Sequence, residues 1–103
     1  MKQIVWLGDS KAVVKSFPGA ARQRAGAELW EVQNGFDPTD WKPMPSVGRG
    51  VREVRIKIEG QYRIIYLTSR PEGIYVLHAF RKKTRTTPKK DIDLAKERLK
   101  TID

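Results

Sequence analysis

The chain has 103 residues, no cysteine and a formal net charge of +9, because 21 Lys and Arg outnumber 12 Asp and Glu. The length predicts a single domain over residues 1–103, and the lack of cysteine excludes disulfides and thiolate metal sites. No apolar run reaches the roughly 20 residues of a membrane span, and no secretion signal follows Met1, so we expect a cytoplasmic protein without a membrane partner. The positive charge favours an anionic partner, with nucleic acid as the first candidate.

The first third of the chain predicts one strand followed by two helices. Residues 3–7 form a short apolar run that is typical of a buried strand. Asp9 or Ser10 can cap a short helix that extends to Phe17, and Pro18 is suited to the first turn of a second helix. This second helix has apolar residues at helical spacing and ends near a glycine that tolerates the left-handed conformation; these residues are Ala21, Ala25, Leu29, Val32 and Gly35.

The middle of the chain predicts a loop and then three strands. Residues 35–50 contain three prolines, which disfavour regular pairing, so we expect a loop there. Residues 51–58 alternate in polarity with the period of a strand, and residues 62–68 and 74–80 are rich in β-branched and aromatic side chains. Short turns separate the three runs, which favours antiparallel pairing of neighbours. In the first run, one face holds Val54, Ile56 and Ile58, and the other holds Glu53, Arg55 and Lys57.

A final helix is predicted after a basic loop. Thr87 can act as its cap, and Pro88 fits its first turn. The predicted order is therefore β-α-α-β-β-β-α, an α+β fold in which a mostly antiparallel sheet packs against helices. The apolar stripe of this last helix is narrow and consists of Ile92, Ala95, Leu99 and Ile102.

The densest group of cations follows the last predicted strand. Residues 81–90 contain six basic side chains and no acidic one, and a rigid strand end can hold the first of them in a fixed position. The alternative interpretation is an ordinary solvated run of charge. The six residues are Arg81, Lys82, Lys83, Arg85, Lys89 and Lys90.

A second group of cations lies on the predicted strands. Arg55 and Lys57 share the polar face of one strand, and Arg63 lies on the next. Arginine offers a planar fork and lysine a compact charge to phosphate oxygens, so these side chains suit a phosphate backbone. A solvated sheet face, with Glu53 as an internal ion-pair partner, is an equally good interpretation. The pattern alone leaves open the register that would place Arg63 beside Arg55.

His78 is the only histidine of the chain. Simple alternation places it on one strand face with Ile74, Val76 and Phe80. A partly buried, hydrogen-bonded histidine is the favoured interpretation, and a general acid or base near the basic loop is the alternative. No zinc-ligand spacing, phosphate-binding glycine loop or catalytic triad is recognisable, so we expect neither a metal nor a cofactor.

Four segments carry the motifs of a known family: residues 40–43 with the following Pro45 and Gly48, residues 51–55, residues 62–66, and residues 76–84 leading to Thr87 and Pro88. Together they resemble the RelE/ParE superfamily of toxins, specifically its phage-related HigB-like branch, over nearly the whole chain. The resemblance implies a compact sheet-and-helix toxin that cleaves messenger RNA without a metal, typically in the ribosomal A site. It also implies a cognate antitoxin as partner, often a helix-turn-helix protein.

The resemblance further implies roles for individual residues. Arg63 matches the arginine of the family's Tyr-Arg strand motif, Arg55 falls where relatives carry a basic residue on the preceding strand, and Lys82 and Lys83 match the basic pair after the last strand. We expect these four to be catalytic, with the arginines stabilising a phosphorane and a lysine transferring a proton or clamping the phosphate. Some relatives carry a Tyr or His near the C-terminus, and this chain has neither after His78. Further RNA contacts are expected from Lys57, His78, Arg81, Arg85, Lys89 and Lys90.

Two other functions compete with RNA cleavage. A ParE-like gyrase poison shares the fold but acts on a protein–DNA complex. A non-catalytic RNA-binding module would bind RNA with a steep salt dependence and leave it uncut. The clustered cations favour cleavage, because phosphoryl chemistry needs stabilisation of negative charge.

Overall fold

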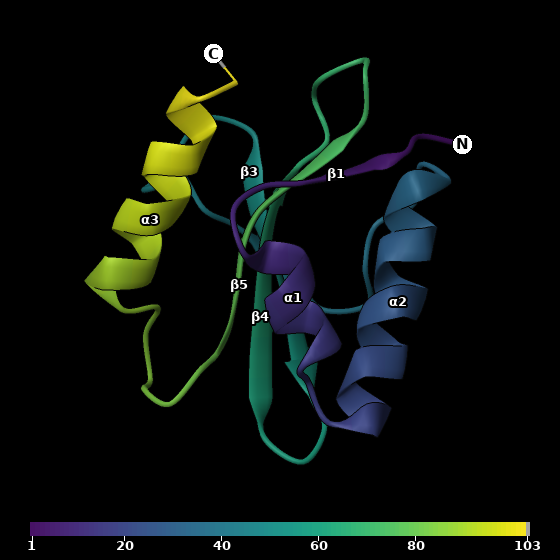
Figure 1. The fold of residues 1–103 in the computed structure, drawn as a ribbon, viewed down its shortest axis with the longest axis vertical. Helices are drawn as coiled ribbons and strands as arrows, with labels where there is room; N and C mark the ends of the chain where they lie inside the picture. Colours follow the sequence, from purple (N-terminus) through teal and green to yellow (C-terminus); the bar gives the residue numbers. More distant parts are fainter. Residues whose placement is uncertain (103) are drawn as a thin grey trace.

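The computed structural model describes residues 1–102 and has the predicted α+β fold, a mixed sheet with helices on both faces (Figure 1). Within these residues no helix has the length and apolar character needed to cross a membrane. In chain order, the elements are β1 (Ile4–Trp6), α1 (Ser10–Lys15), α2 (Gly19–Gln33), β2 (Trp41–Pro43), β3 (Val51–Lys57), β4 (Gln61–Leu67), β5 (Ile74–Arg81) and α3 (Lys89–Lys100).

The described residues form one five-stranded sheet in the order β1-β5-β4-β3-β2. The three strands β3, β4 and β5 pair antiparallel with their sequence neighbours, as their short turns predict. The first strand, β1, pairs parallel with β5 at one edge. The sheet is therefore mostly antiparallel, which confirms the predicted fold class.

The sheet separates two apolar clusters. The helices α1 and α2 cover one face and α3 covers the other (Figure 1). Alternation along β3 explains the division, because Val54 and Ile56 pack on the α1–α2 side and Val51 packs on the α3 side. Glu53 and Arg55 share the face of Val51. Glu53 and Arg55 consequently lie on the α3 side of the sheet, whereas Arg52 lies on the other.

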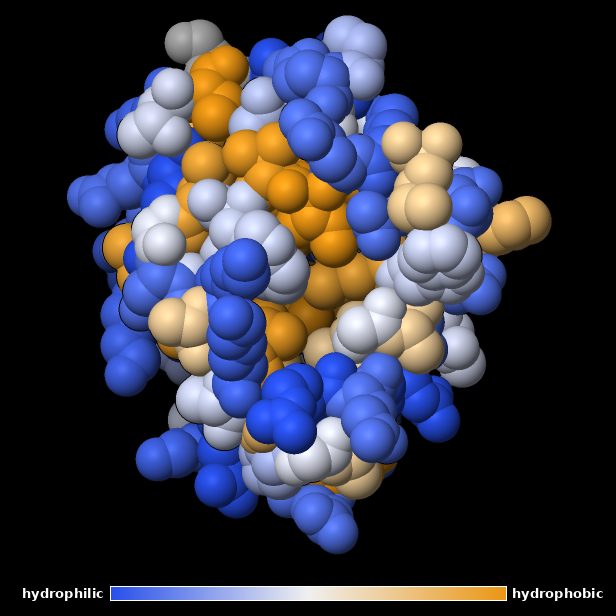
Figure 2. Space-filling model, turned by 45° about the vertical axis from the view of Figure 1, so that its right-hand side comes forward, coloured by the Kyte–Doolittle hydropathy of each residue, from blue (hydrophilic) through white to orange (hydrophobic). Residues whose placement is uncertain are grey.

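The α1–α2 side of the core is not completely covered. Ile4, Trp6 and Val13 are only partly buried against this cluster. Figure 2 shows apolar side chains in a hollow at the middle of the face that it presents, ringed by hydrophilic side chains.

The loop predicted for residues 35–50 is wrong in its middle, because β2 forms there and pairs antiparallel with β3. The strand is short and lies at the edge of the sheet, where a proline such as Pro43 is tolerated because its missing amide hydrogen can face away from the partner strand. The Arg52 guanidinium lies 4.1 Å from the ring centre of Trp41. This contact holds the half-buried indole at the sheet edge.

The predicted helix caps are also wrong in part. Thr87 does not cap α3, since the cap position is Pro88 and no side chain caps the helix. Pro18 occupies the same position before α2, and Asp9 stands before α1 without a capping hydrogen bond. The polar side chains are engaged elsewhere, because the Thr87 hydroxyl donates to Glu53 and the Asp9 carboxylate accepts from Arg98.

The predicted face of His78 needs correction. The pairing of β4 with β5 shifts register between Ile65, opposite His78, and Tyr66, opposite Val76, which leaves Leu77 as an extra residue. A bulge of this kind reverses which side the following residues face. Val76 therefore packs on the α1–α2 side, whereas Phe80 packs on the α3 side. His78 lies on the α3 side with Phe80, its ring stacked at 5.3 Å between centres.

The junction of β1 with β5 predicts a glycine requirement at position 73. A β-carbon there would lie 2.7 Å from the backbone oxygen of Gln3, which accepts the amide hydrogen of Ile74. We expect Gly73→Ala to lower the free energy of unfolding by about 1–3 kcal/mol, because backbone atoms must move apart. The matched control is Gly26→Ala in α2, where nothing lies within 4 Å of the added methyl group. It should stabilise the helix by about 0.5–1 kcal/mol. Urea unfolding measures both, and equal midpoints for Gly73→Ala and the wild type would contradict the tight packing.

Candidate active site

Four cations from four segments meet on the α3 side of the sheet. Arg55 of β3 and Arg63 of β4 are direct cross-strand partners, so their side chains share one face. Lys42 of β2 pairs with Glu53 in the same way. Lys82 follows β5 directly and lies close enough for the charges of the other three to act on it. We call Lys42, Arg55, Arg63 and Lys82 the cationic cluster.

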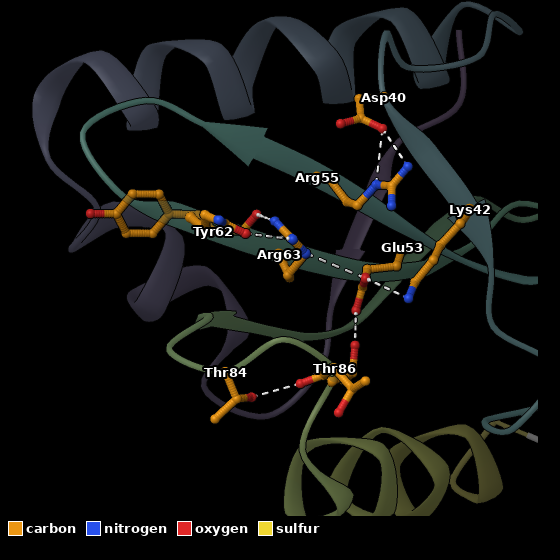
Figure 3. Close-up of polar contacts among 10 residues, drawn as sticks. Asp40, Lys42, Glu53, Arg55, Tyr62, Arg63, Thr84 and Thr86 are labelled. Carbon is orange, nitrogen blue, oxygen red and sulfur yellow. Dashed lines mark hydrogen bonds and ion pairs between the residues drawn. The ribbon is translucent and has the colours of Figure 1, made fainter.

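Arg63 is the buried member of the cationic cluster, with a side chain that is 2% exposed. Its guanidinium donates to the backbone oxygen of Tyr62 at 3.1 Å and to Oε1 of Gln61 at 2.9 Å (Figure 3). Burial lowers the pKa of Arg63, and the Glu53 carboxylate opposes this shift. Because an arginine stays protonated under these conditions, Arg63 is a fixed positive charge beneath the surface.

Glu53 supplies the counter-charge and is completely buried. Its Oε1 lies 3.4 Å from Nε of Arg63 and 3.9 Å from Nζ of Lys42 (Figure 3). Neither this oxygen nor Nε of Arg63 makes a hydrogen bond, so the contact is an ion pair alone. The other carboxylate oxygen accepts a hydrogen bond of 2.8 Å from Thr87. One carboxylate therefore connects β2, β4 and the segment before α3 to β3.

Arg55 and Lys42 bring positive charge to the surface. Their side chains are 33% and 37% exposed. Arg55 donates to Oδ1 of Asp40 from two nitrogens, Nε at 2.9 Å and Nη2 at 2.7 Å, and its backbone amide donates to the Asp40 backbone oxygen (Figure 3). This clamp orients the guanidinium while leaving part of it open to solvent.

Lys82 is the member of the cationic cluster that can act as a proton acceptor, because its amine has a lowered pKa. Its backbone amide donates to the Gln61 backbone oxygen at 2.7 Å, which extends the β4–β5 pairing by one residue. Burial lowers the pKa of the Lys82 amine, the positive charges of Arg63, Lys42 and Arg55 lower it further, and the Glu53 carboxylate opposes the shift. A lysine in such surroundings loses its proton more easily than one in water, so it is a candidate proton acceptor.

The structure thus brings together Arg55, Arg63 and Lys82, three of the four residues expected to be catalytic. The fourth, Lys83, is exposed in the adjoining loop. Among the expected RNA contacts, Arg81 is exposed with its guanidinium 5.9 Å from the ring centre of Tyr62. Lys57, Arg85, Lys89 and Lys90 are exposed as well.

His78 is held in the interior. It is 5% exposed, and its Nε2 lies 2.7 Å from Oδ1 of Asp91 in α3. Its Nδ1 lies 3.2 Å from a guanidinium nitrogen of Arg98. Because an arginine can only donate, Nδ1 accepts, and Nε2 carries the hydrogen that is donated to Asp91. His78 therefore connects β5 to α3, as the buried, hydrogen-bonded interpretation predicts, and we leave it out of the proposed RNA-contacting set.

Three residues of the site were not among the predicted site residues: Lys42, Glu53 and Thr87. Lys42 belongs to the matched segment 40–43, but this segment was predicted as a loop, so a position for Lys42 on an edge strand was not expected. The sequence pattern predicts an ion-pair role for Glu53 and a helix cap at Thr87, and neither places these residues in the site. Within residues 1–102, no three carboxylate, imidazole or thiol groups lie close enough together to hold a metal ion.

The fold and the cationic cluster define a small basic α+β protein whose sheet presents fixed positive charge, an arrangement suited to a phosphate-bearing ligand. The chain belongs to the family described as Phage derived protein Gp49-like (DUF891), whose model matches residues 12–100. This family is associated with RelE-like toxins of toxin–antitoxin systems, in agreement with the superfamily resemblance, and it implies a cognate antitoxin as partner. No curated protein matches the chain.

The buried pair predicts a large effect of neutralising Glu53. Glu53→Gln keeps the size of the side chain but leaves Arg63 buried without its counter-charge. We expect the free energy of unfolding to fall by about 3–5 kcal/mol, the usual effect of breaking a buried pair on one side. Urea denaturation followed by circular dichroism measures the change.

The matched control is Asp93→Asn, which removes the partner of Lys89 from an exposed pair in α3. Exposed pairs contribute little, so its urea midpoint should stay close to that of the wild type. A Glu53→Gln variant as stable as the control would show that the buried charge does not support the fold.

Proposed function

We propose that this protein is the toxin of a toxin–antitoxin pair and that it is a metal-independent endoribonuclease of the HigB-like branch. It would act in the cytoplasm on messenger RNA bound to the ribosome, and a cognate antitoxin, a helix-turn-helix protein, would neutralise it. The observation that carries the proposal is the position of the accessible charges of Lys42, Arg55 and Lys82 around the buried charge of Arg63 on one sheet face. Membership of the Gp49-like family supports it.

In the proposed reaction, the ribose 2′-hydroxyl attacks its own 3′-phosphate. The bond from phosphorus to the 5′ oxygen of the next nucleotide breaks, which leaves a 2′,3′-cyclic phosphate and a free 5′-hydroxyl. The neutral amine of Lys82 accepts the proton of the 2′-hydroxyl, because its surroundings lower its pKa. The leaving 5′ oxygen takes a proton from a second ammonium group, for which Lys42 and Lys83 are the candidates.

The arginines would act on the negative charge that grows on the phosphorane. Arg55 is exposed enough to donate directly to a phosphate oxygen. Arg63 is buried, so it would act through its electric field and by holding the geometry of the strand face. The exposed cations outside the cationic cluster would hold the RNA backbone; they are Lys57, Arg81, Lys83, Arg85, Lys89 and Lys90.

The first test is cleavage of ribosome-bound message by purified protein, with mapping of transcript 5′ ends. We expect Arg55→Ala to slow single-turnover cleavage by about 10²–10³-fold, the usual effect of removing one donor to a developing oxyanion. The matched control is Lys11→Ala, an exposed lysine on α1, on the other side of the sheet. It should cut at the wild-type rate.

Three results would overturn the proposal or its assignment. Wild-type protein that binds RNA and leaves it uncut would indicate a binding module, and broken DNA with intact transcripts would indicate a gyrase poison. Wild-type cleavage rates in Arg55→Ala would reject the assigned role of this arginine.

The lowered pKa of Lys82 predicts the sign of a pH dependence. The active form is the neutral amine, so the cleavage rate should rise with pH until the pKa of Lys82 is passed and then level off. Because that pKa is below the ordinary lysine value, the plateau should come at lower pH than for a solvated lysine. Lys82→Arg keeps a positive charge that does not titrate, so its residual rate should be low and flat between about pH 6 and 9. Single-turnover rates measure both profiles, and an unchanged ascending limb in Lys82→Arg would exclude Lys82 as the base.

A further inference from the structure

The basic loop between β5 and α3 is attached to the sheet at both ends. At its start, the backbone amide of Lys82 donates to the Gln61 backbone oxygen at 2.7 Å. At its end, the Thr87 hydroxyl donates to Oε2 of Glu53 at 2.8 Å, a contact that joins residues 34 positions apart. The intervening residues, 83–86, are exposed. Two hydrogen bonds therefore attach the two ends of this loop to the sheet.

The contact at Thr87 is well protected from water. Glu53 is 0% exposed and Thr87 is 9% exposed. A hydrogen bond from a neutral hydroxyl to a buried carboxylate is stronger than one between neutral groups. Thr87 is also the residue that the sequence pattern assigns to a helix cap, yet its hydroxyl points to the sheet and the helix begins uncapped. The side chain is used to fix the loop, not to begin α3.

The acceptor is the residue at the centre of the cationic cluster. The same Glu53 carboxylate holds Arg63 at 3.4 Å and Lys42 at 3.9 Å through its other oxygen. The same carboxylate therefore contacts both the end of the basic loop and the buried arginine. Movement of the Thr87 end away from Glu53 would also release residues 83–86, which include Lys83, while Lys82 would stay attached to Gln61.

We infer that the hydrogen bond from Thr87 to Glu53 is a latch that positions the basic loop over the cationic cluster, and that Thr87 is a positioning residue for the reaction. The inference rests on the proposed function for its catalytic consequence. The attachment of the loop can be measured without RNA. Opening the latch should lower kcat more than it raises KM, because Lys83, a candidate proton donor, would lose its place while many other cations still hold RNA.

The experiment compares three single variants of the full chain. Thr87→Val removes the hydroxyl and keeps the branched shape, and Thr87→Ser restores a hydroxyl. Thr86→Val is the matched control, because Thr86 is exposed in the same loop and contributes its backbone oxygen, which accepts from the Thr84 hydroxyl at 2.6 Å. Limited trypsin digestion, read by mass spectrometry, measures cutting after the basic residues 81–85. Circular dichroism melting checks that each variant is folded.

We expect Thr87→Val to speed cutting of the loop about tenfold, because the open form becomes more populated. Its kcat for RNA cleavage should fall about tenfold with KM within about twofold of the wild type. Thr87→Ser and Thr86→Val should resemble the wild type in both measurements.

A folded Thr87→Val variant with wild-type loop protection and wild-type kcat would overturn the latch. A variant with a loosened loop and unchanged kcat would overturn its catalytic role. If the wild type cuts no RNA, the proposed function fails while the digestion still decides whether the latch exists. If Thr87→Val does not fold, Thr87→Ala takes its place with the same expectations.

Discussion

The ion pair between Glu53 and Arg63 is the interaction on which the candidate site depends. Two opposite charges lie buried on one face of the sheet, where water cannot solvate either of them. Such a pair is maintained only if neighbouring groups satisfy the remaining polar atoms. Gln61 and the backbone of Tyr62, both in β4, accept from the arginine, and Thr87, in the segment before α3, donates to the carboxylate. The need to compensate one buried charge pair thus assembles the site.

The same pair allows like charges to lie close together. Lys42, Arg55 and Lys82 would repel one another and Arg63 on an isolated surface. The buried carboxylate offsets part of that repulsion, and Asp40 offsets more by clamping Arg55. Burial lowers the pKa of Lys82, and the neighbouring positive charges lower it further, so the carboxylate does not cancel their effect. In the proposed reaction, a bound phosphodiester would bring the negative charge that the cationic cluster lacks.

The sequence predicts the parts of the structure that depend on local periodicity. Alternation along β3 correctly divides its apolar and polar faces, and the short turns predict the antiparallel order of β3, β4 and β5. Register is a tertiary property, so the pairing of Arg55 with Arg63 could not be read from either strand alone. The burial of Arg63 was equally hidden, because it depends on the strands that pair on both sides of β4 and on the Glu53 carboxylate. The proposed catalytic roles stay predictions.

The errors have common physical causes. The extra residue Leu77 reverses the side on which His78 lies, and bulges leave no clear pattern in one sequence. The prolines of residues 35–50 indicated a loop, but proline is tolerated in an edge strand, which is where β2 lies. Thr87 and Asp9 have the chemistry of helix caps, but distant partners offer them stronger contacts, a buried carboxylate in one case and a guanidinium in the other. At these two residues, the contact with a charged partner far away in the sequence replaces the capping hydrogen bond that the local sequence favours.

The parallel pairing of β1 with β5 has a consequence for biosynthesis. Ile4 can pair in the sheet only after Ile74 has been synthesised. Asp9 can form its ion pair only after Arg98, 89 positions later, has been synthesised. Contacts between such distant segments form slowly, and neither can form while the later segment is still inside the exit tunnel of the translating ribosome. The nascent chain therefore completes its sheet only after β5 has left the tunnel, and it joins Asp9 to α3 only after Arg98 has left it.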